Sequence, residues 1–169
     1  MAEVIRDGAV VADTWQVLRL AEGETPEHAA VPAEAVIVPL DVWRARRAEL
    51  ESRAHLGVWL KSSEGPELIA ADLERFRVIA VDFPKFTDGR GYSTATLLRT
   101  RYGWRGELRA IGDVLRDQLF FLRRCGFDSF ALRPDQEPYA ALASWIPFSD
   151  PYQGAVDVPQ PLWRRHARR

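Results

Sequence analysis

Short apolar runs recur along the chain from residue 35, and most are followed by a segment with helical periodicity. Apolar runs of this length, bounded by polar, Gly or Pro residues, are typical of strands buried on both faces of a sheet. They predict strands at Val36–Val38, Leu56–Leu60, Val78–Val81, Glu107–Ile111 and Phe127–Leu132. Because strands that alternate with helices run parallel, the pattern predicts an α/β fold whose mostly parallel sheet is built from about five successive βα units.

The segments between these strands predict the helices. The first is capped by Asp41 and runs to Arg53, and a short one begins at Pro66 with Leu68, Ile69, Leu73 and Phe76 pointing inward. Further helices are predicted from Ser93 and Thr94, from Val114 to Cys125 after an Asp113 cap and before the terminator Gly126, and from Pro138 to Trp145. We expect an open twisted sheet, because a closed barrel needs about eight units, with a partial barrel as the alternative.

The two ends of the chain differ from this βα pattern. Asp7-Gly8 is a hairpin turn signal, so Val4–Arg6 and Ala9–Ala12 predict a small N-terminal β-hairpin, with Thr14–Leu18 as a candidate extension. We expect a single domain over 1–169, divided into the hairpin region 1–20, a linker 21–34, the βα core 35–146 and an irregular C-terminal tail 147–169. The tail is expected to pack Phe148, Tyr152 and Trp163 against the domain, and it ends in an arginine cluster.

Composition narrows the class of protein. The net charge of -1 gives no general reason to expect nucleic acid or an acidic membrane as partner, and no apolar run approaches the roughly 20 residues of a membrane helix. The single cysteine excludes an internal disulfide framework, and no signal peptide is recognised, so we expect a cytoplasmic protein. The three histidines lack zinc-ligand spacing, and no flavin, NAD or iron–sulfur motif is found, so no metal and no cofactor are expected.

Charged residues follow the predicted strands where the carboxyl ends of parallel strands share one edge. In chain order they are Asp41, Lys61, Asp82 with Lys85, Asp113 and Arg133. The only two lysines of the chain, Lys61 and Lys85, both lie just past a predicted strand. This placement indicates a cationic rim that can hold an anion, and the alternative is ordinary polar loops.

A glycine-containing loop follows the third predicted strand. Gly89, Arg90 and Gly91 precede Ser93 and Thr94 at a helix start, where free N–H groups favour negative charge. These five residues are our candidate anion site, with the Arg90 guanidinium as a bidentate donor. The loop matches neither the dinucleotide fingerprint nor a Walker A loop, and the alternative is a tight turn with an ordinary cap.

Arg109 lies between Leu108 and Ala110 in a strand predicted to be covered on both faces. A buried guanidinium needs a partner, and Asp82 on the neighbouring strand is the candidate. Two interpretations stay open: a structural ion pair, or a ligand-facing Arg109 with Asp82 as acid, base or orienting group. The candidate catalytic residues are therefore Asp82, Lys85 and Arg109.

Cys125 is a weak candidate for catalysis. It falls near a predicted helix C-terminus, where the partial negative charge raises the thiol pKa, and on the apolar side of that helix. We expect it to be a buried structural residue.

Two long sequence motifs, FPKFTDGRGYS and GELRAIGDVLRDQ, resemble those of an uncharacterised bacterial family, DUF934. The resemblance is close over Val81–Leu132 and looser over Asp135–Arg165, which carries Phe148-x-x-x-Tyr152-Gln153. Members are commonly labelled as probable oxidoreductases involved in sulfite reduction. The resemblance implies an association with assimilatory sulfate reduction, beside the sirohaem sulfite reductase and the adenylyl-sulfate reductase, and it supplies no catalytic residues.

Two hypotheses about function follow. In the first, the protein is an accessory or adaptor that binds sulfite reductase, another sulfate-assimilation enzyme or a small oxyanion. In the second, it is a small enzyme in which Asp82, Lys85, Arg90 and Arg109 converge on a sulfur oxyanion or a phosphorylated substrate. The sequence makes no prediction of oligomeric state.

Overall fold

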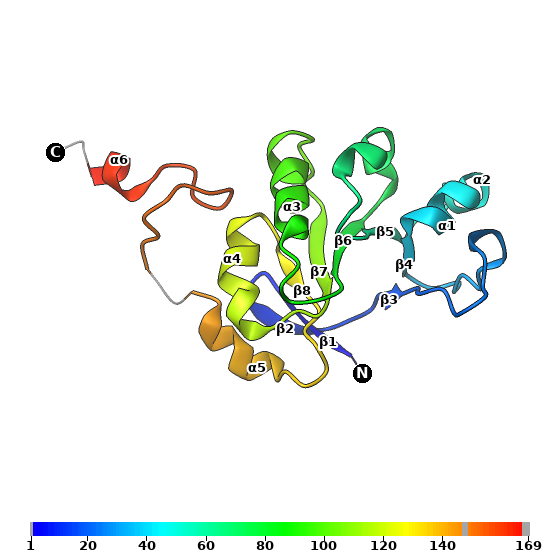
Figure 1. The fold of residues 1–169 in the computed structure, drawn as a ribbon, viewed down its shortest axis with the longest axis horizontal. Helices are drawn as coiled ribbons and strands as arrows, with labels where there is room; N and C mark the ends of the chain where they lie inside the picture. Colours follow the sequence, from blue (N-terminus) through cyan, green and yellow to red (C-terminus); the bar gives the residue numbers. More distant parts are fainter. Residues whose placement is uncertain (1, 147–148, 167–169) are drawn as a thin grey trace.

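A computed structural model describes residues 2–146 and 149–166 of the chain (Figure 1). Its strands form one sheet in the order β2-β1-β8-β7-β6-β5-β4-β3. They are β1 (Glu3–Arg6), β2 (Ala9–Ala12), β3 (Gln16–Val17), β4 (Val36–Pro39), β5 (Leu56–Leu60), β6 (Val78–Phe83), β7 (Glu107–Gly112) and β8 (Ser129–Phe130). Neighbours from β3 to β8 run parallel, whereas β1 pairs antiparallel with β2 and β8. The fold is therefore mixed α/β with a mostly parallel sheet.

The helices are short apart from α3. They are α1 (Leu40–Ala45), α2 (Arg47–Leu50), α3 (Arg90–Thr100), α4 (Leu119–Arg124), α5 (Pro138–Ala141) and α6 (Leu162–His166). Single or paired 3₁₀ turns are η1 (Pro26–His28), η2 (Pro66–Leu68), η3 (Ala70–Arg75), η4 (Arg116–Gln118) and η5 (Leu142–Ser144). Five regular βα units are not confirmed, because the connection from β5 to β6 contains 3₁₀ turns in place of an α-helix.

The sheet is open and curled, like half of a barrel. Strands β4 to β8 follow one another in chain order without the reversal that marks a doubly wound sheet. The large core cluster joins one face of these strands to the helices, and no helical residue belongs to the smaller cluster on the other face. The partial barrel, our alternative, thus describes the sheet better than the twisted open sheet that we expected.

A strap made of residues 13–20 covers the helix-free face of the sheet. The chain runs from β2 across to β3 at the opposite edge (Figure 1), and Trp15 and Val17 pack against the small apolar cluster on that face. The indole Nε1 of Trp59 on β5 donates a 2.8 Å hydrogen bond to the carbonyl of Leu18, and the Arg19 guanidinium lies over the Trp59 ring. The strap therefore covers the apolar cluster on this face of the sheet, as the helices cover the core on the other face.

Arg109 is buried under the strap, with only 1% of its surface exposed. Its Nη1 donates 2.9 Å hydrogen bonds to both carboxylate oxygens of Asp13, and its Nη2 lies 2.7 Å from Glu107. The predicted pairing of Arg109 with Asp82 is wrong: Asp82 pairs with Arg19 at 2.6 Å. The register places Ala80 opposite Arg109, and the strap brings in a carboxylate from 96 positions away.

The N-terminal hairpin is confirmed, but its predicted extension is wrong. Asp7 and Gly8 have φ values of 51° and 80°, as a two-residue type I′ turn requires. The extension predicted at Thr14–Leu18 instead contributes Gln16–Val17, which pairs with β4 at the far edge of the sheet.

Several predicted helices are shorter than the pattern suggested. The helix predicted from Asp41 to Arg53 breaks at Arg46, whose φ of -122° is not helical and whose guanidinium donates to the carbonyl of Ala29. Asp41 does not cap it, because its carboxylate bonds Lys61. Leu68 in the segment after Pro66 is exposed, contrary to prediction.

The later helices also begin elsewhere than predicted. Helix α3 begins at Arg90, ahead of the predicted Ser93 start. The helix predicted over Val114–Cys125 is reduced to η4 and α4, and Asp113 does not cap it. The terminator Gly126 has the left-handed φ, 110°, expected of it.

The C-terminal arm, residues 149–166, touches the domain through a few contacts and then leaves it (Figure 1). The amide of Val156 donates to the carbonyl of Arg124, and Asp157 lies 3.4 Å from Arg123. Tyr152 and Trp163 are exposed, so the prediction that they pack against the domain is wrong; Phe148 lies outside the described residues.

Replacing Asp13 with alanine should destabilise the fold by roughly 3 kcal/mol, the low end for breaking a buried ion pair, because Glu107 still compensates Arg109. Asp117→Ala, which removes an exposed carboxylate, is the control and should change the free energy of unfolding by less than about 0.5 kcal/mol. Urea unfolding measures both variants. An Asp13→Ala midpoint equal to that of the wild type would show that the strap is not held by this pair.

Candidate functional site

The carboxyl ends of β4 to β8 share one edge, and among the described residues the charged side chains there are paired with one another, Lys85 excepted. Lys61, after β5, lies 2.7 Å from Asp41 and 3.6 Å from Glu64. The hydrogen bond to Asp41 raises the pKa of the Lys61 ammonium. The cationic rim predicted from the lysines is therefore compensated at Lys61 by neighbouring carboxylates.

Arg90, the central donor of the predicted anion site, is bound to a carboxylate of its own loop. Its Nη2 lies 2.7 Å from Asp88 and 2.9 Å from the Ser62 hydroxyl, which itself donates to Asp88 at 2.7 Å. The backbone N–H of Arg90, at the start of α3, also donates to Asp88. These bonds hold the pKa of Asp88 far below its usual range, and the hydrogen bond from the Arg90 side chain has the largest effect. Asp88 thus occupies the place predicted for an external anion.

The other residues of the predicted anion site do not line a common cradle. A Cβ at Gly91 would lie 2.8 Å from the Phe83 ring, so this glycine lets α3 pack against β6. Thr94 is buried, whereas Gly89 and Ser93 are exposed. Gly91 and Thr94 are therefore accounted for by packing.

The three candidate catalytic residues are not joined to one another by any hydrogen bond or ion pair within residues 2–146 and 149–166. Asp82 accepts from Arg19, and Arg109 bonds Asp13 and Glu107. Lys85 is exposed, and its ammonium makes no hydrogen bond or ion pair in the described part of the chain. An acid–base constellation needs its members within hydrogen-bond reach of one another or of one reacting group, and this set does not have that arrangement.

The loop between β6 and α3 is held by side chains that follow β7. The backbone N–H of Phe86 donates to Asp113 at 2.9 Å, and its carbonyl accepts from the Gln118 amide at 3.1 Å. Asp113 is fixed in turn by a 2.9 Å bond from Arg133. Asp113 and Arg133, which the sequence placed at this edge, therefore fix a loop rather than face a ligand.

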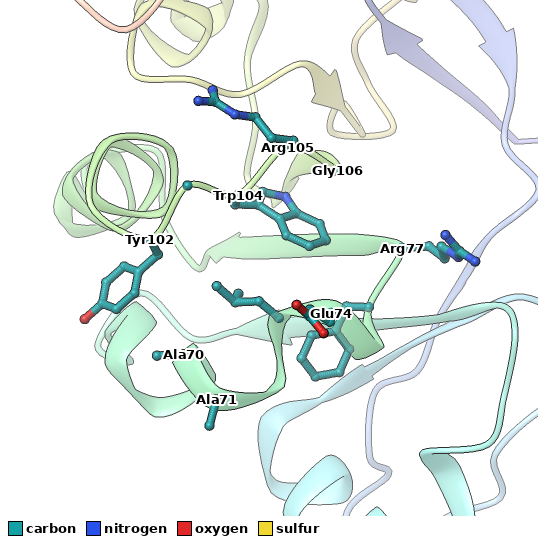
Figure 2. Close-up of a pocket in the computed structure, with 11 residues that line it drawn as sticks. Ala70, Ala71, Glu74, Arg77, Tyr102, Trp104, Arg105 and Gly106 are labelled. Atoms are coloured by element: carbon teal, nitrogen blue, oxygen red, sulfur yellow. The ribbon is translucent and has the colours of Figure 1, made fainter.

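A cavity of about 580 Å³ lies at the other end of the strands, beside the amino ends of β6 and β7 (Figure 2). Its walls come from η3 and from the turn after α3, and the lining residues are Ala70, Ala71, Leu73, Glu74, Phe76, Arg77, Tyr102, Gly103, Trp104, Arg105 and Gly106. Figure 2 shows Glu74 and Trp104 within the cavity, with the Arg77 and Arg105 side chains extending away from them. No hydrogen bond or ion pair joins Glu74, Arg77 and Arg105, so the cavity offers apolar and aromatic walls to a small molecule without an assembled acid–base pair.

The sequence pattern did not indicate this cavity. Ligand sites in parallel sheets are expected after the strands, and this cavity lies before two of them. The available signal was the run Tyr102-Gly103-Trp104-Arg105-Gly106, in which two aromatic residues alternate with glycines that bend the chain. Gly103 has a φ of 67°, which favours glycine.

Cys125 lies at the end of α4 and is half-buried. It borders a shallow cavity of about 370 Å³ with Tyr92, Ser93, Thr96 and Leu97. Burial raises the pKa of the Cys125 thiol.

In the described part of the chain, no group of three His, Cys, Asp or Glu side chains is placed to hold a metal ion.

The fold and the carboxyl ends of the strands define a class: a mixed α/β protein with a half-barrel sheet, in which the strand-end charges other than that of Lys85 are paired within the chain. The sequence profile of a family described as "Bacterial protein of unknown function (DUF934)" matches residues 57–163, from β5 into α6, and the chain belongs to this family. No curated protein and no solved structure matches it. None of the described helices is long and apolar enough to cross a membrane.

If Asp88 fills the anion position, removing its charge should open that position. We expect millimolar sulfate or sulfite to leave the melting temperature of the wild type unchanged and to raise that of Asp88→Asn by about 2 °C, because ligand binding stabilises the folded state. Asp135→Asn, which removes the charge of an exposed carboxylate paired with Arg133, is the control and should gain nothing. A wild-type shift as large as that of Asp88→Asn would contradict the assignment.

The raised pKa of Cys125 predicts slow alkylation. At neutral pH the folded protein should react with iodoacetamide more slowly than a cysteine in an unstructured peptide, and its rate should reach half its maximum at a higher pH than that of the peptide. Unfolding in urea should restore the peptide rate. A folded-state rate at pH 7 above that of the peptide would indicate an activated thiol.

Proposed function

We propose that this protein is an accessory of assimilatory sulfate and sulfite reduction that acts by binding a partner protein, with sulfite reductase as the first candidate. The sulfur assignment rests on the family resemblance carried by FPKFTDGRGYS and GELRAIGDVLRDQ. The proposed place of action is the cytoplasm, in keeping with a chain that has one cysteine.

The observation that carries the accessory role is the pairing of Arg90 with Asp88 and Ser62. An oxyanion enzyme at this edge would need cations that are available to substrate, whereas this guanidinium is occupied by a carboxylate of the same loop. Arg109, another cation of the proposed enzyme site, is buried beneath the strap, so Lys85 alone of the three is exposed and unpaired among the described residues. The geometry therefore favours the accessory over the small enzyme.

Growth of a deletion strain separates the two hypotheses. Without the protein, we expect slow growth with sulfate or sulfite as sole sulfur source and normal growth with sulfide, because only the former need the reduction. Growth on sulfate should be restored by wild type and equally by Asp82→Asn and Arg90→Ala, which remove charged groups that an enzyme at this edge would require.

Immunoblotting must show that the variants reach wild-type abundance. Loss of complementation by both variants at normal abundance would favour the enzyme. Normal growth of the deletion strain on sulfate and sulfite would contradict the assignment to sulfur assimilation.

A further inference from the structure

Phe86 combines a fixed backbone with an exposed ring. Its N–H and its carbonyl are both bonded by side chains from the segment after β7, those of Asp113 and Gln118, yet 55% of the residue is exposed. Side-chain hydrogen bonds to both main-chain groups of one loop residue restrict its φ and ψ. The chain thus fixes the backbone that carries an exposed aromatic ring, and this ring contributes little to its own core.

We propose that the loop Pro84–Asp88 is the surface by which this protein docks on its partner, with the Phe86 ring entering an apolar pocket and the Lys85 ammonium facing a carboxylate beside that pocket. The inference rests on the proposed function and names the contact surface that it leaves open. The occupant is a folded protein that presents an apolar cleft with an acidic border.

The aromatic ring supplies the reason for an apolar pocket. Buried aromatic rings dominate the energetics of protein interfaces, and a residue whose backbone is already fixed loses less conformational entropy on binding. Pro84 stiffens the entry to the loop through its fixed φ, and the N–H of Asp88 closes the turn by donating to the carbonyl of Lys85 at 2.9 Å. The loop is therefore preorganised.

The charge of Lys85 supplies the reason for an acidic border. Around it, Arg90 pairs with Asp88, Lys61 with Asp41, Arg19 with Asp82, and Arg133 with Asp113. Lys85 forms no ion pair among the described residues, so it is the unpaired one of these five cations. A carboxylate on the partner complements it, and a second cation would repel it.

Two matched controls exist on the same chain. Phe121 on α4 is 64% exposed and carries the same ring, but neither its N–H nor its carbonyl is bonded by a side chain. Lys61 lies at the same edge as Lys85, and its ammonium is already paired. Phe121→Ala and Lys61→Ala therefore remove the same side chains without touching the proposed contact.

The test is calorimetric titration of the purified protein with purified sulfite reductase from the same organism. Phe86→Ala should weaken binding at least about tenfold and Lys85→Ala about three- to tenfold, as expected of an interface anchor and of its charged neighbour. Phe121→Ala and Lys61→Ala should bind within about twofold of wild type. Thermal melts check that Phe86→Ala folds, which its exposed ring predicts.

The outcomes separate this inference from the proposed function. Wild-type binding that Phe86→Ala leaves unchanged overturns the docking surface and keeps the accessory role. If the wild type does not bind the reductase, that partner fails, and photo-crosslinking in cells decides the surface, with p-benzoylphenylalanine at position 86 or 121. A discrete product from position 86 alone, lost with Lys85→Ala, supports the surface; equal or no products from both positions overturn it.

Discussion

A guanidinium buried on the helix-free face of a curled sheet constrains the rest of this structure. Arg109 is almost without solvent, so its charge must be met by carboxylates, and Asp13 and Glu107 meet it. Asp13 belongs to the strap, so the pair ties the chain between the hairpin and β3 across that face. The hairpin then closes one edge of the sheet through β8, and β3 closes the other through β4.

The strap also reaches the carboxyl edge of the strands, where Arg19 bonds Asp82. This contact joins the series of ion pairs that compensate Asp88, Asp41 and Asp113 along the same edge. Such pairs contribute little stability at an exposed edge, but they occupy the donors that an anionic ligand would need. The exposed side chains of Lys85 and Phe86 in the loop Pro84–Asp88 are not occupied by such pairs within the described part of the chain. This is why we propose that the protein acts by contact with another protein.

The strands could be predicted because a strand buried on both faces reads as a continuous apolar run, as Val36–Val38 and Val78–Val81 do. Helix lengths could not, because tertiary contacts ended them: Arg46 leaves the helical region and donates to the carbonyl of Ala29. The need of Arg109 for a partner followed from its apolar neighbours, but the identity of that partner depended on where residue 13 lies. Likewise, the sequence indicated that the loop before α3 is suited to an anion. It did not indicate that the Asp88 carboxylate of the same loop is that anion.

The measurement that tests the central claim most directly is an NMR titration of the arginine side chains and α3 amides with sulfite, sulfate and phosphate. If the strand-end charges are compensated within the chain, the Arg90 Nε–H resonance and the amides of Gly91 and Ser93 keep their positions up to about a hundredfold excess of each anion, since the guanidinium stays on Asp88. A saturable shift of Arg90 together with these amides would contradict the account and restore the oxyanion site.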